Sequence, residues 1–383
     1  MISRYSTNEM NSIWSEEAYF KNLNYFIYSY LNTILNREVL LIEAEPNIPR
    51  IREIESSTKH EFASVLIHFE ERIDPTDQEA KKFLNSKLTS SDALDTVFTY
   101  QCVSSVAYIK IEIDNLIKIL NNKILSIKNL PAMGRTHGRH AETILFKNRF
   151  EHLKQELFYS LELFCQFQNT IYPKLNGPTG SLVMPDNINQ SMTNFYSNII
   201  TFSNKNFTTQ IVPRHLYSIL IFASSIVSAA IDRFSQNMRI LSIDEINEVQ
   251  ESFSQGQIGS SSMPHKVNPI SFENFSGIHR LIKSNINPSI ENISLWFERD
   301  MSHSSVERII YPDNFHLLHY LLKRFSSVIE KLNINTDAIQ NNLLNSTSKN
   351  SVVQFNQLCE SMNRFEAYNA IQNEYLNNKK MKF

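Results

Sequence analysis

The sequence predicts an all-α protein built around an elongated bundle of long helices. Only 7 of the 383 residues are glycine, far fewer than the usual share of about 7%, so strained turns are rare. Residues 139–172 contain neither proline nor glycine, a length that allows a helix of about 50 Å. Apolar residues recur at helical spacing, and no convincing alternation typical of a strand is present. The pattern therefore predicts helices packed side by side and no strands.

Apolar stripes locate the predicted helices along the chain. Each stripe recurs every three or four residues and should face a core. The stripes are Phe62, Val65, Leu66 and Phe69; then Ile113, Leu116, Ile117, Leu120, Ile124 and Ile127; then Phe150, Leu153, Leu157, Leu161 and Phe164. Residues 216–231 are uncharged but shorter than the roughly 20 residues that span a bilayer, which predicts a helix buried on all sides. Pro288 should interrupt the helical pattern around it.

Composition along the chain predicts three parts. Residues 1–105 have shorter periodic segments and a turn-rich stretch at 44–50, which predicts a smaller N-terminal helical domain. Residues 106–340 hold the long periodic segments of the central bundle. After about residue 340 the chain becomes rich in Asn and Ser, which predicts a small C-terminal helical segment at 341–383.

Charge and cysteine content exclude several classes of protein. Lys and Arg number 37 against 39 Asp and Glu, so no basic surface for nucleic acid or an anionic membrane is expected. The three cysteines lie far apart in sequence, which excludes a paired zinc or redox motif and fits a reducing compartment. The first residues contain no apolar run typical of a signal peptide. We therefore expect a cytoplasmic protein.

The glycines gather in three short segments, which are the first candidates for a functional site. They are Gly134 and Gly138; Gly177 and Gly180; and Gly256, Gly259 and Gly277. Glycine permits positive φ and the close approach of backbone to a ligand. Clusters of glycine in a chain otherwise free of it therefore point to specialised backbone.

Two of these segments carry residues suited to proton transfer or anion binding. The Gly-Ser-Ser turn beginning at Gly259 exposes N–H groups near Lys266, which could hold a carboxylate or an oxyanion, although such a loop is more often only solvated. Thr136 and His137 precede the predicted long helix, whose N-terminus would favour anions, although a histidine there is more often a cap. These residues alone do not identify the reaction that the protein catalyses.

Other common sites are not expected. His137 and His140 could form a metal pair, but the sequence offers no HExxH motif and no obvious third ligand, so no metal is predicted. The sequence contains no G-x-S-x-G elbow, P-loop or G-x-G-x-x-G motif. This argues against an acyl hydrolase, a nucleoside triphosphatase and a Rossmann dehydrogenase.

The loop at residues 259–269, GSSSMPHKVNP, resembles the signature of the fumarase/aspartase superfamily, whose members eliminate fumarate from succinyl compounds. Further stretches resemble the adenylosuccinate lyase branch of this superfamily, in the same order along the chain and extending to about residue 375. They are residues 4–6, 54–60, 88–96, 133–142 and 295–313. The resemblance implies a long-helix bundle, a nucleotide substrate, no cofactor, and a homotetramer whose active sites are shared between subunits.

The resemblance also implies a reaction. A proton leaves the succinyl carbon next to a carboxylate and the C–N bond to the nucleotide base breaks, so that adenylosuccinate gives AMP and fumarate. The succinylated imidazole carboxamide ribotide of purine biosynthesis would react in the same way. Such a site must stabilise the aci-carboxylate that forms.

Residue roles follow from the matched motifs. Ser260 would be the general base and His137 the general acid. Glu273 matches the glutamate that pairs with this histidine, and His60 matches a second histidine that contacts the phosphate or the reacting centre. The resemblance assigns carboxylate binding to Thr89, Ser90, Thr136, Lys266 and Asn268. It places Gln210 near the substrate and assigns the nucleotide end to Arg4, Tyr5, Arg299, Ser304 and Arg308.

The chain also departs from the family pattern. Asn85 and Lys87 replace a histidine and a glycine, the turn at residues 179–183 lacks its second glycine, and the C-terminal domain looks shortened. His215 and Glu61 each replace an aspartate. These changes leave two alternatives open: a lyase of the same superfamily acting on another N-succinyl compound, such as an argininosuccinate-like substrate, or a degenerate homologue with a binding or structural role.

Overall fold

The computed structural model describes residues 2–253, 256, 259, 262–263, 265–346 and 349–380, with only the backbone for 377–380. The described chain is predominantly helical, which confirms the predicted all-α class. In chain order the elements are η1 (Ser3–Tyr5), α1 (Asn8–Trp14), α2 (Glu16–Leu35), α3 (Ile48–Thr58), α4 (Glu61–Arg72), α5 (Gln78–Phe83), α6 (Ser90–Ile127), β1 (Pro131–Thr136), β2 (Arg139–Leu145), α7 (Asn148–Thr170), α8 (Asp186–Phe195), α9 (His215–Leu241), β3 (Val249–Gln250), α10 (Ile270–Ser284), α11 (Ile286–Glu291), α12 (Ser302–Lys331), β4 (Asn333–Ile334), α13 (Thr336–Leu344), α14 (Ser351–Leu358) and α15 (Arg364–Lys380).

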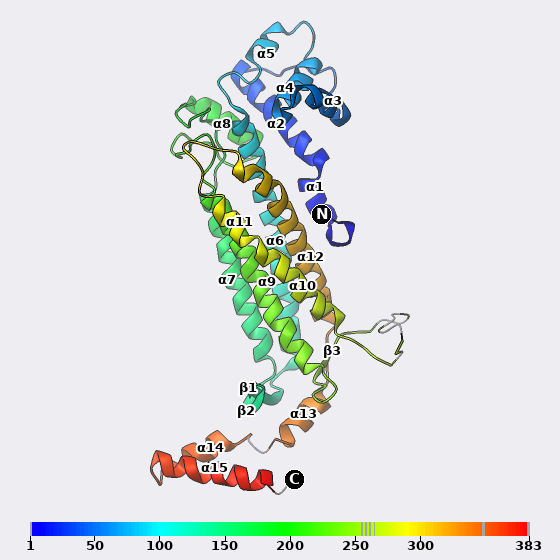
Figure 1. Ribbon diagram of the computed structural model, residues 1–383, viewed down its shortest axis with the longest axis vertical. Helices are drawn as coiled ribbons and strands as arrows, with labels where there is room; N and C mark the ends of the chain where they lie inside the picture. The colour runs from blue at the N-terminus through cyan, green and yellow to red at the C-terminus, as the bar shows by residue number, and fades with distance from the viewer. Residues whose placement is uncertain are drawn as a thin grey trace. The chain divides into compact units, whose positions relative to one another are not determined.

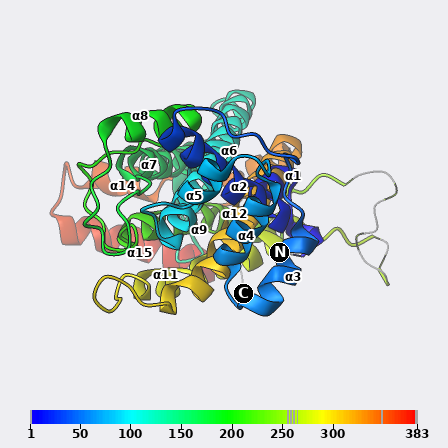
Figure 2. The same ribbon diagram turned by 90° about the horizontal axis from the view of Figure 1, so that it is seen from above.

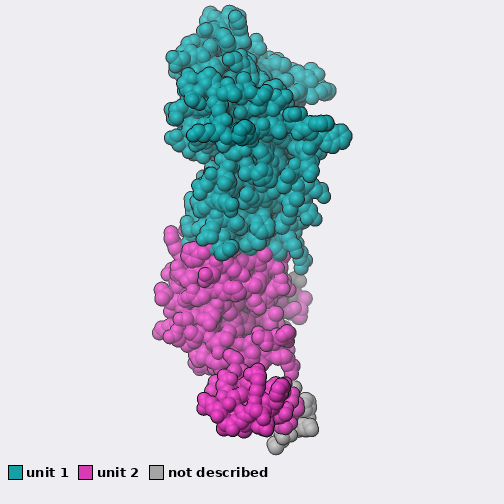
Figure 3. All heavy atoms as spheres, turned by 90° about the vertical axis from the view of Figure 1, so that its left-hand side faces the viewer, with its two compact units in different colours: residues 1–114, 159–228, 278–323 teal, residues 115–158, 229–277, 324–383 magenta. Residues whose placement is uncertain are grey.

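The chain forms two compact units, and the longest helices contribute to both. Unit 1 comprises residues 1–114, 159–228 and 278–323, and unit 2 comprises residues 115–158, 229–277 and 324–383. Figure 3 shows the atoms of unit 1 in teal and those of unit 2 in magenta.

Unit 1 contains the N-terminal helices and one part of the long-helix bundle (Figures 1 and 2). α3 packs on α4, and α8 packs on α2. α4 also contacts α2. The bundle is held by rings from four helices: the Phe98 ring on α6 lies 4.7 Å from Tyr217 on α9 and 5.0 Å from Tyr311 on α12, and Phe167 on α7 lies 6.4 Å from Tyr217. Tyr217 is fully buried, and its hydroxyl is satisfied by a hydrogen bond with Thr99 (2.7 Å).

Unit 2 has its own aromatic core, built by the same helices further along their length. The Phe234 ring on α9 lies 5.2 Å from Phe150 on α7 and 5.8 Å from Phe325 on α12, while Phe275 on α10 lies 5.4 Å from Phe325. All four rings are buried. Large aromatic side chains bury much apolar area, so these contacts contribute to the cohesion of this unit.

The predicted stripes are buried in nearly every position. All six members of the 113–127 stripe are buried, as are Phe62, Val65, Phe69, Phe150, Leu153, Leu157 and Phe164. Only Leu66 and Leu161 are half-exposed. Pro288 also acts as predicted: α10 ends at Ser284, the residue whose carbonyl the proline ring would meet in a continuous helix, and α11 begins at Ile286.

The prediction that residues 139–172 form one helix is wrong, as is the expectation of no strands. Residues 131–136 and 139–145 pair as an antiparallel hairpin, and α7 begins only at Asn148. Thr136 pairs with Arg139, so His137 (φ 52°) and Gly138 (φ 72°) form the two-residue turn. Positive φ at both turn positions is the I′ geometry that matches the twist of a hairpin. Thr136 and His137 therefore sit at a hairpin tip and not at a helix N-terminus.

α9 is the one described helix that is long and apolar enough to cross a membrane. A core helix of a soluble protein passes the same test, and 56% of its most apolar window is buried. The prediction of burial on all sides is wrong for the single chain, because Phe222 is 49% exposed and Ile226 is 36% exposed. The helix thus packs on its neighbours along one side and leaves an apolar stripe on another.

Buried histidines on α12 predict a loss of stability in acid. Burial lowers the pKa of both His316 and His319 to about 4. Because the unfolded chain binds these protons near pH 6.5, stability should fall as the pH drops from about 6.5 towards 4. Urea unfolding at pH 7 and pH 5 should show a smaller loss for His319→Gln than for the unaltered protein, whereas the exposed-site control His152→Gln should lose as much as the unaltered protein. An equal loss for His319→Gln would contradict this reasoning.

Candidate active site

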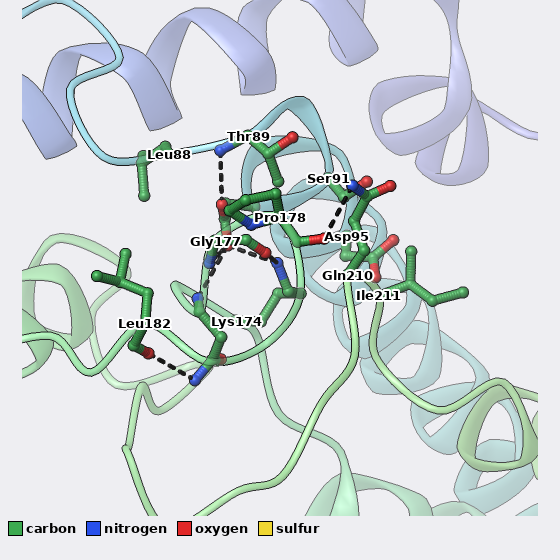
Figure 4. Close-up of polar contacts among 12 residues, drawn as sticks. Leu88, Thr89, Ser91, Asp95, Lys174, Gly177, Pro178, Leu182, Gln210 and Ile211 are labelled. Atoms are coloured by element: carbon green, nitrogen blue, oxygen red, sulfur yellow. Dashed lines mark hydrogen bonds and ion pairs between the residues drawn. The ribbon is translucent and has the colours of Figure 1, made fainter. Parts of the chain in front are cut away.

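The first part of the site is the start of α6. Here residues 89–92 (TSSD) contact the turn at residues 174–178 of unit 1. Asp92 is fully buried and its Oδ2 accepts from the Thr89 N–H (2.8 Å), as in one half of a capping box. Its Oδ1 accepts from the Lys174 ammonium (2.6 Å) and from the N–H groups of Asn176 (3.0 Å) and Gly177 (3.2 Å). Figure 4 shows Lys174 and Gly177 gathered below Thr89. One carboxylate thus holds both the helix start and the turn.

Gln210 and Arg299 join the same group of residues. The Gln210 side-chain N–H donates to the Pro178 carbonyl (3.0 Å), and its Oε1 accepts from Arg299 Nη1 (3.0 Å). Arg299 Nη1 also donates to Ser91 Oγ (2.8 Å). Gln210 and Arg299, which both match substrate-binding residues of the family, are therefore in direct contact.

Gly180 explains how the altered turn at residues 179–183 folds. It has a φ of +78°, and a Cβ there would lie 2.0 Å from the Thr208 carbonyl oxygen. Only glycine tolerates this combination of left-handed backbone and close approach. The turn closes with a hydrogen bond from the Leu182 N–H to the Asn176 carbonyl (3.0 Å), so the segment remains tightly folded without the family's second glycine.

A cavity of about 330 Å³ in unit 1 brings together three of the residues matched to the nucleotide end. Arg299, Ser304 and Arg308 all line it, beside apolar walls that include Trp14 and Phe98. Most of the lining residues are polar or charged, more than in the usual small-molecule site, whose walls are mainly apolar. The volume lies at the low end of the range for such sites.

Arg308 is held by Glu61, which stands where the family has an aspartate. The guanidinium donates to Glu61 Oε1 (2.7 Å) and Oε2 (3.2 Å), and the Tyr19 hydroxyl also donates to Oε1 (2.8 Å). Burial opposes ionisation of Glu61, but the hydrogen bond and charge of Arg308 outweigh it and hold the pKa of Glu61 below its ordinary value. The longer glutamate therefore keeps a full ion pair at the rim of the cavity.

Charged residues that sequence reasoning missed form the floor of this cavity. Arg214 donates to both oxygens of Asp95 (2.8 Å each) and to both oxygens of Glu307 (2.9 and 3.2 Å). All three are buried. Burial raises the pKa of Glu307 to about 7, and the opposing charge of Arg214 limits the rise. Burial also lowers the pKa of His303, another lining residue, to about 4.

The remaining matched residues of unit 1 lie near the surface. His60 is exposed and caps α4, its Nδ1 accepting from the Ala63 N–H (3.2 Å). Arg4 is exposed in η1, and the Tyr5 ring packs 5.1 Å from Tyr320. None of these three is among the described residues that line the cavity. Ser90 begins α6 and is half-exposed.

The other matched residues belong to unit 2, and most are exposed. Thr136 and His137 occupy the tip of the β1–β2 hairpin, and Lys266 and Glu273 are also exposed. The hairpin is anchored close to its turn, where Arg135 donates to the buried Glu248 (2.8 Å). Among the described residues, no hydrogen bond or ion pair joins His137 to Glu273 within one chain.

The signature loop is only partly described. Asn268 donates through Nδ2 to the Gly259 carbonyl (3.3 Å), and a Cβ at Gly259 would lie 2.4 Å from the Lys266 carbonyl oxygen. This close approach accounts for one glycine of the motif. Ser260, matched to the general base, lies outside the described residues. The described residues also hold no cluster of three His, Cys, Asp or Glu side chains that could bind a metal.

Comparisons with known proteins agree on the fold and the family. A family model described as lyase matches residues 42–282. An adenylosuccinate lyase from Streptococcus mutans is 34% identical over 352 residues, which cover 90% of this chain and 80% of that protein.

Two solved structures show the same fold at 16% identity. They are a 3-carboxy-cis,cis-muconate lactonizing enzyme from Pseudomonas putida (TM-score 0.83, covering 96% of this chain and 85% of that one) and a fumarate lyase from Mesorhizobium sp. BNC1 (TM-score 0.82, covering 99% and 89%). At this level of identity the likeness concerns the fold, while the sequence matches concern the family. The chain therefore belongs to the adenylosuccinate lyase family of the fumarase/aspartase superfamily.

Proposed function

We propose that the protein is a fumarate-releasing C–N lyase that cleaves adenylosuccinate to AMP and fumarate. It would act in the same way on the succinylated imidazole carboxamide ribotide. The observation that carries this proposal is the gathering of Arg299, Ser304 and Arg308 around one cavity. Guanidinium groups bind phosphate through paired N–H donors, so this set suits the nucleotide end of the substrate. The 34% identity to an adenylosuccinate lyase supports the same reading.

The chemistry assigns a step to three of the matched residues, Ser260, His137 and Lys266. Ser260 takes the proton from the succinyl carbon next to a carboxylate, and the electron pair of that C–H bond forms the new C=C bond. The C–N bond breaks, and its electrons go to the nitrogen of the base, which takes a proton from His137. Lys266, together with hydroxyl and amide donors, stabilises the aci-carboxylate that precedes C–N cleavage.

The proposal extends to a homotetramer that shares its active sites between subunits. The matched residues divide between the two units of the chain, with Arg299, Ser304 and Arg308 in unit 1 and His137 and Lys266 in unit 2. The apolar stripe that α9 leaves exposed is the kind of surface that a partner subunit covers. Light scattering coupled to gel filtration tests the assembly, and a monomer would contradict shared sites.

We further expect a cytoplasmic location, which suits the free Cys102, Cys165 and Cys359.

A direct assay tests the activity. Purified, folded protein should release fumarate from adenylosuccinate, seen as absorbance at 240 nm, and a parallel panel should include the succinylated ribotide and argininosuccinate. Turnover of argininosuccinate alone would favour the related lyase that acts on another amine. Folded protein that releases fumarate from none of these compounds would contradict the proposal and favour a binding or structural role.

A further inference from the structure

Lys174 is a buried cation to which the proposed chemistry gives no step. It is 1% exposed, and its partner Asp92 is fully buried. The ammonium donates to Asp92 Oδ1 (2.6 Å) and to the Gly177 carbonyl (3.3 Å). Burying two charges is costly unless they are paired and hydrogen-bonded. A pair in such a place needs a reason beyond stability, because an apolar pair of similar volume is often as stable.

The surroundings of the pair suggest that reason. Asp92 binds the backbone N–H of Thr89 on one side and the N–H groups of Asn176 and Gly177 on the other. Thr89 and Ser90 are matched to the binding of the substrate carboxylates, and both are half-exposed, so a ligand can reach them. Asp92 thus fixes the backbone that presents these two residues, while Lys174 fixes Asp92.

The contacts continue in a closed ring. The turn held by Asp92 leads to Pro178, whose carbonyl accepts from Gln210, and Gln210 accepts from Arg299 (3.0 Å for both bonds). Arg299 then donates to Ser91 (2.8 Å), the residue before Asp92. Figure 4 shows Ser91, Gly177, Pro178 and Gln210 of this ring near the start of α6. Four segments that are far apart in sequence therefore fix one another.

We propose that the Lys174–Asp92 ion pair is a positioning element for the carboxylate end of the active site. It acts through Thr89 and Ser90 and touches no ligand itself. This inference rests on the proposed function, because it takes those residues to bind the fumarate end of the substrate. Without the ammonium, the Asp92 carboxylate keeps only backbone donors, and the buried charge that joins the start of α6 to the turn is no longer neutralised.

The inference predicts that loss of the ion pair weakens the binding of fumarate much more than the binding of AMP. Lys174→Met should weaken inhibition by fumarate about tenfold or more, since small displacements of binding groups cost this much. Inhibition by AMP should change by less than about threefold, because Ser304 and Arg308 lie outside the ring. Arg299, the ring's one residue matched to the nucleotide end, is bonded to Ser91 and Gln210 rather than to the ion pair itself. Lys174→Arg, which keeps the charge, should restore most of the fumarate affinity. The matched control is Lys323→Met, which breaks an exposed pair with Glu9 (2.6 Å) and should change neither constant.

The measurements are inhibition constants for fumarate and AMP, taken at a temperature where circular dichroism shows each variant to be folded. If Lys174→Met does not fold, Asp92→Asn replaces it: the charge is lost, and the one amide oxygen keeps the backbone bonds of one side only, either Thr89 or the turn at Asn176 and Gly177. Fumarate and AMP constants that stay unchanged, or that rise together, would overturn the inference. Failure of both variants to fold would also overturn it, because the pair would then serve folding itself.

The inference and the proposed function can fail separately. If the unaltered protein releases no fumarate from adenylosuccinate, the proposed function fails, and titration calorimetry with fumarate and with AMP still compares the binding of the two. If the unaltered protein is active but Lys174→Met keeps its fumarate affinity, only the inference fails. Unaltered protein that binds no fumarate would overturn the inference directly.

Discussion

Replacing Arg214 with methionine is expected to destabilise the protein by about 3–5 kcal/mol, the cost of breaking a buried ion pair by removing one partner. The change leaves Asp95 and Glu307 facing each other without the guanidinium that both of them bind. The two carboxylates are 5% and 9% exposed, so water cannot compensate either charge. Urea unfolding followed by circular dichroism measures the loss.

A control on α9, the helix that begins directly after Arg214, separates burial from charge pairing in general. Arg233 pairs with one glutamate, Glu156, and its side chain is 35% exposed. Arg233→Met should therefore cost under about 1 kcal/mol, as exposed pairs usually do. Arg214→Lys should remain strongly destabilised, because an ammonium cannot fork to two carboxylates. A loss for Arg214→Met no larger than that for Arg233→Met would refute the reasoning.

Helical periodicity predicted the core well because each stripe is a local property of the chain. The stripe from Ile113 to Ile127 is buried throughout, as its spacing requires. The hairpin at residues 131–145 was missed for a physical reason. Most of β2 is exposed, so no apolar alternation marks it, and the residues that define the turn are His137 and Gly138, of which only the glycine signals positive φ.

The sequence predicted site residues only where those residues belong to a recognisable motif. Arg299, Ser304 and Arg308 lie within ten residues of one another on a recognisable stretch, and all three line the cavity. The charged pairs that hold the site are different, since Lys174 and Asp92 are separated by 82 residues and Arg214 and Asp95 by 119. Periodicity and spacing do not report which buried charges pair across such distances. A charged residue inside an apolar helical stretch is the one available hint.

Replacing His137 with asparagine is expected to lower kcat by about 10²- to 10⁴-fold, the usual contribution of a general acid. Stability should change little, because the side chain is exposed and asparagine tolerates the left-handed backbone (φ 52°) of the hairpin turn. His140 on the same hairpin is the matched control. It is exposed and pairs with Ser346 Oγ (3.0 Å), and His140→Asn should keep kcat within about threefold. Equal losses for the two variants would show that His137 has no special role.

Mixing inactive variants tests whether the acid and the base come from different copies of the chain. Ser260→Ala should also be inactive, since it removes the proposed base. If Ser260 of one subunit works with His137 of another, co-refolded Ser260→Ala and His137→Asn chains form hybrid oligomers in which some sites carry both intact residues. Fumarate release in the mixture should then rise well above the residual rate of either variant alone. If the mixture stays inactive, both residues act within one copy and the shared-site proposal fails, because every copy in the hybrid lacks one of them.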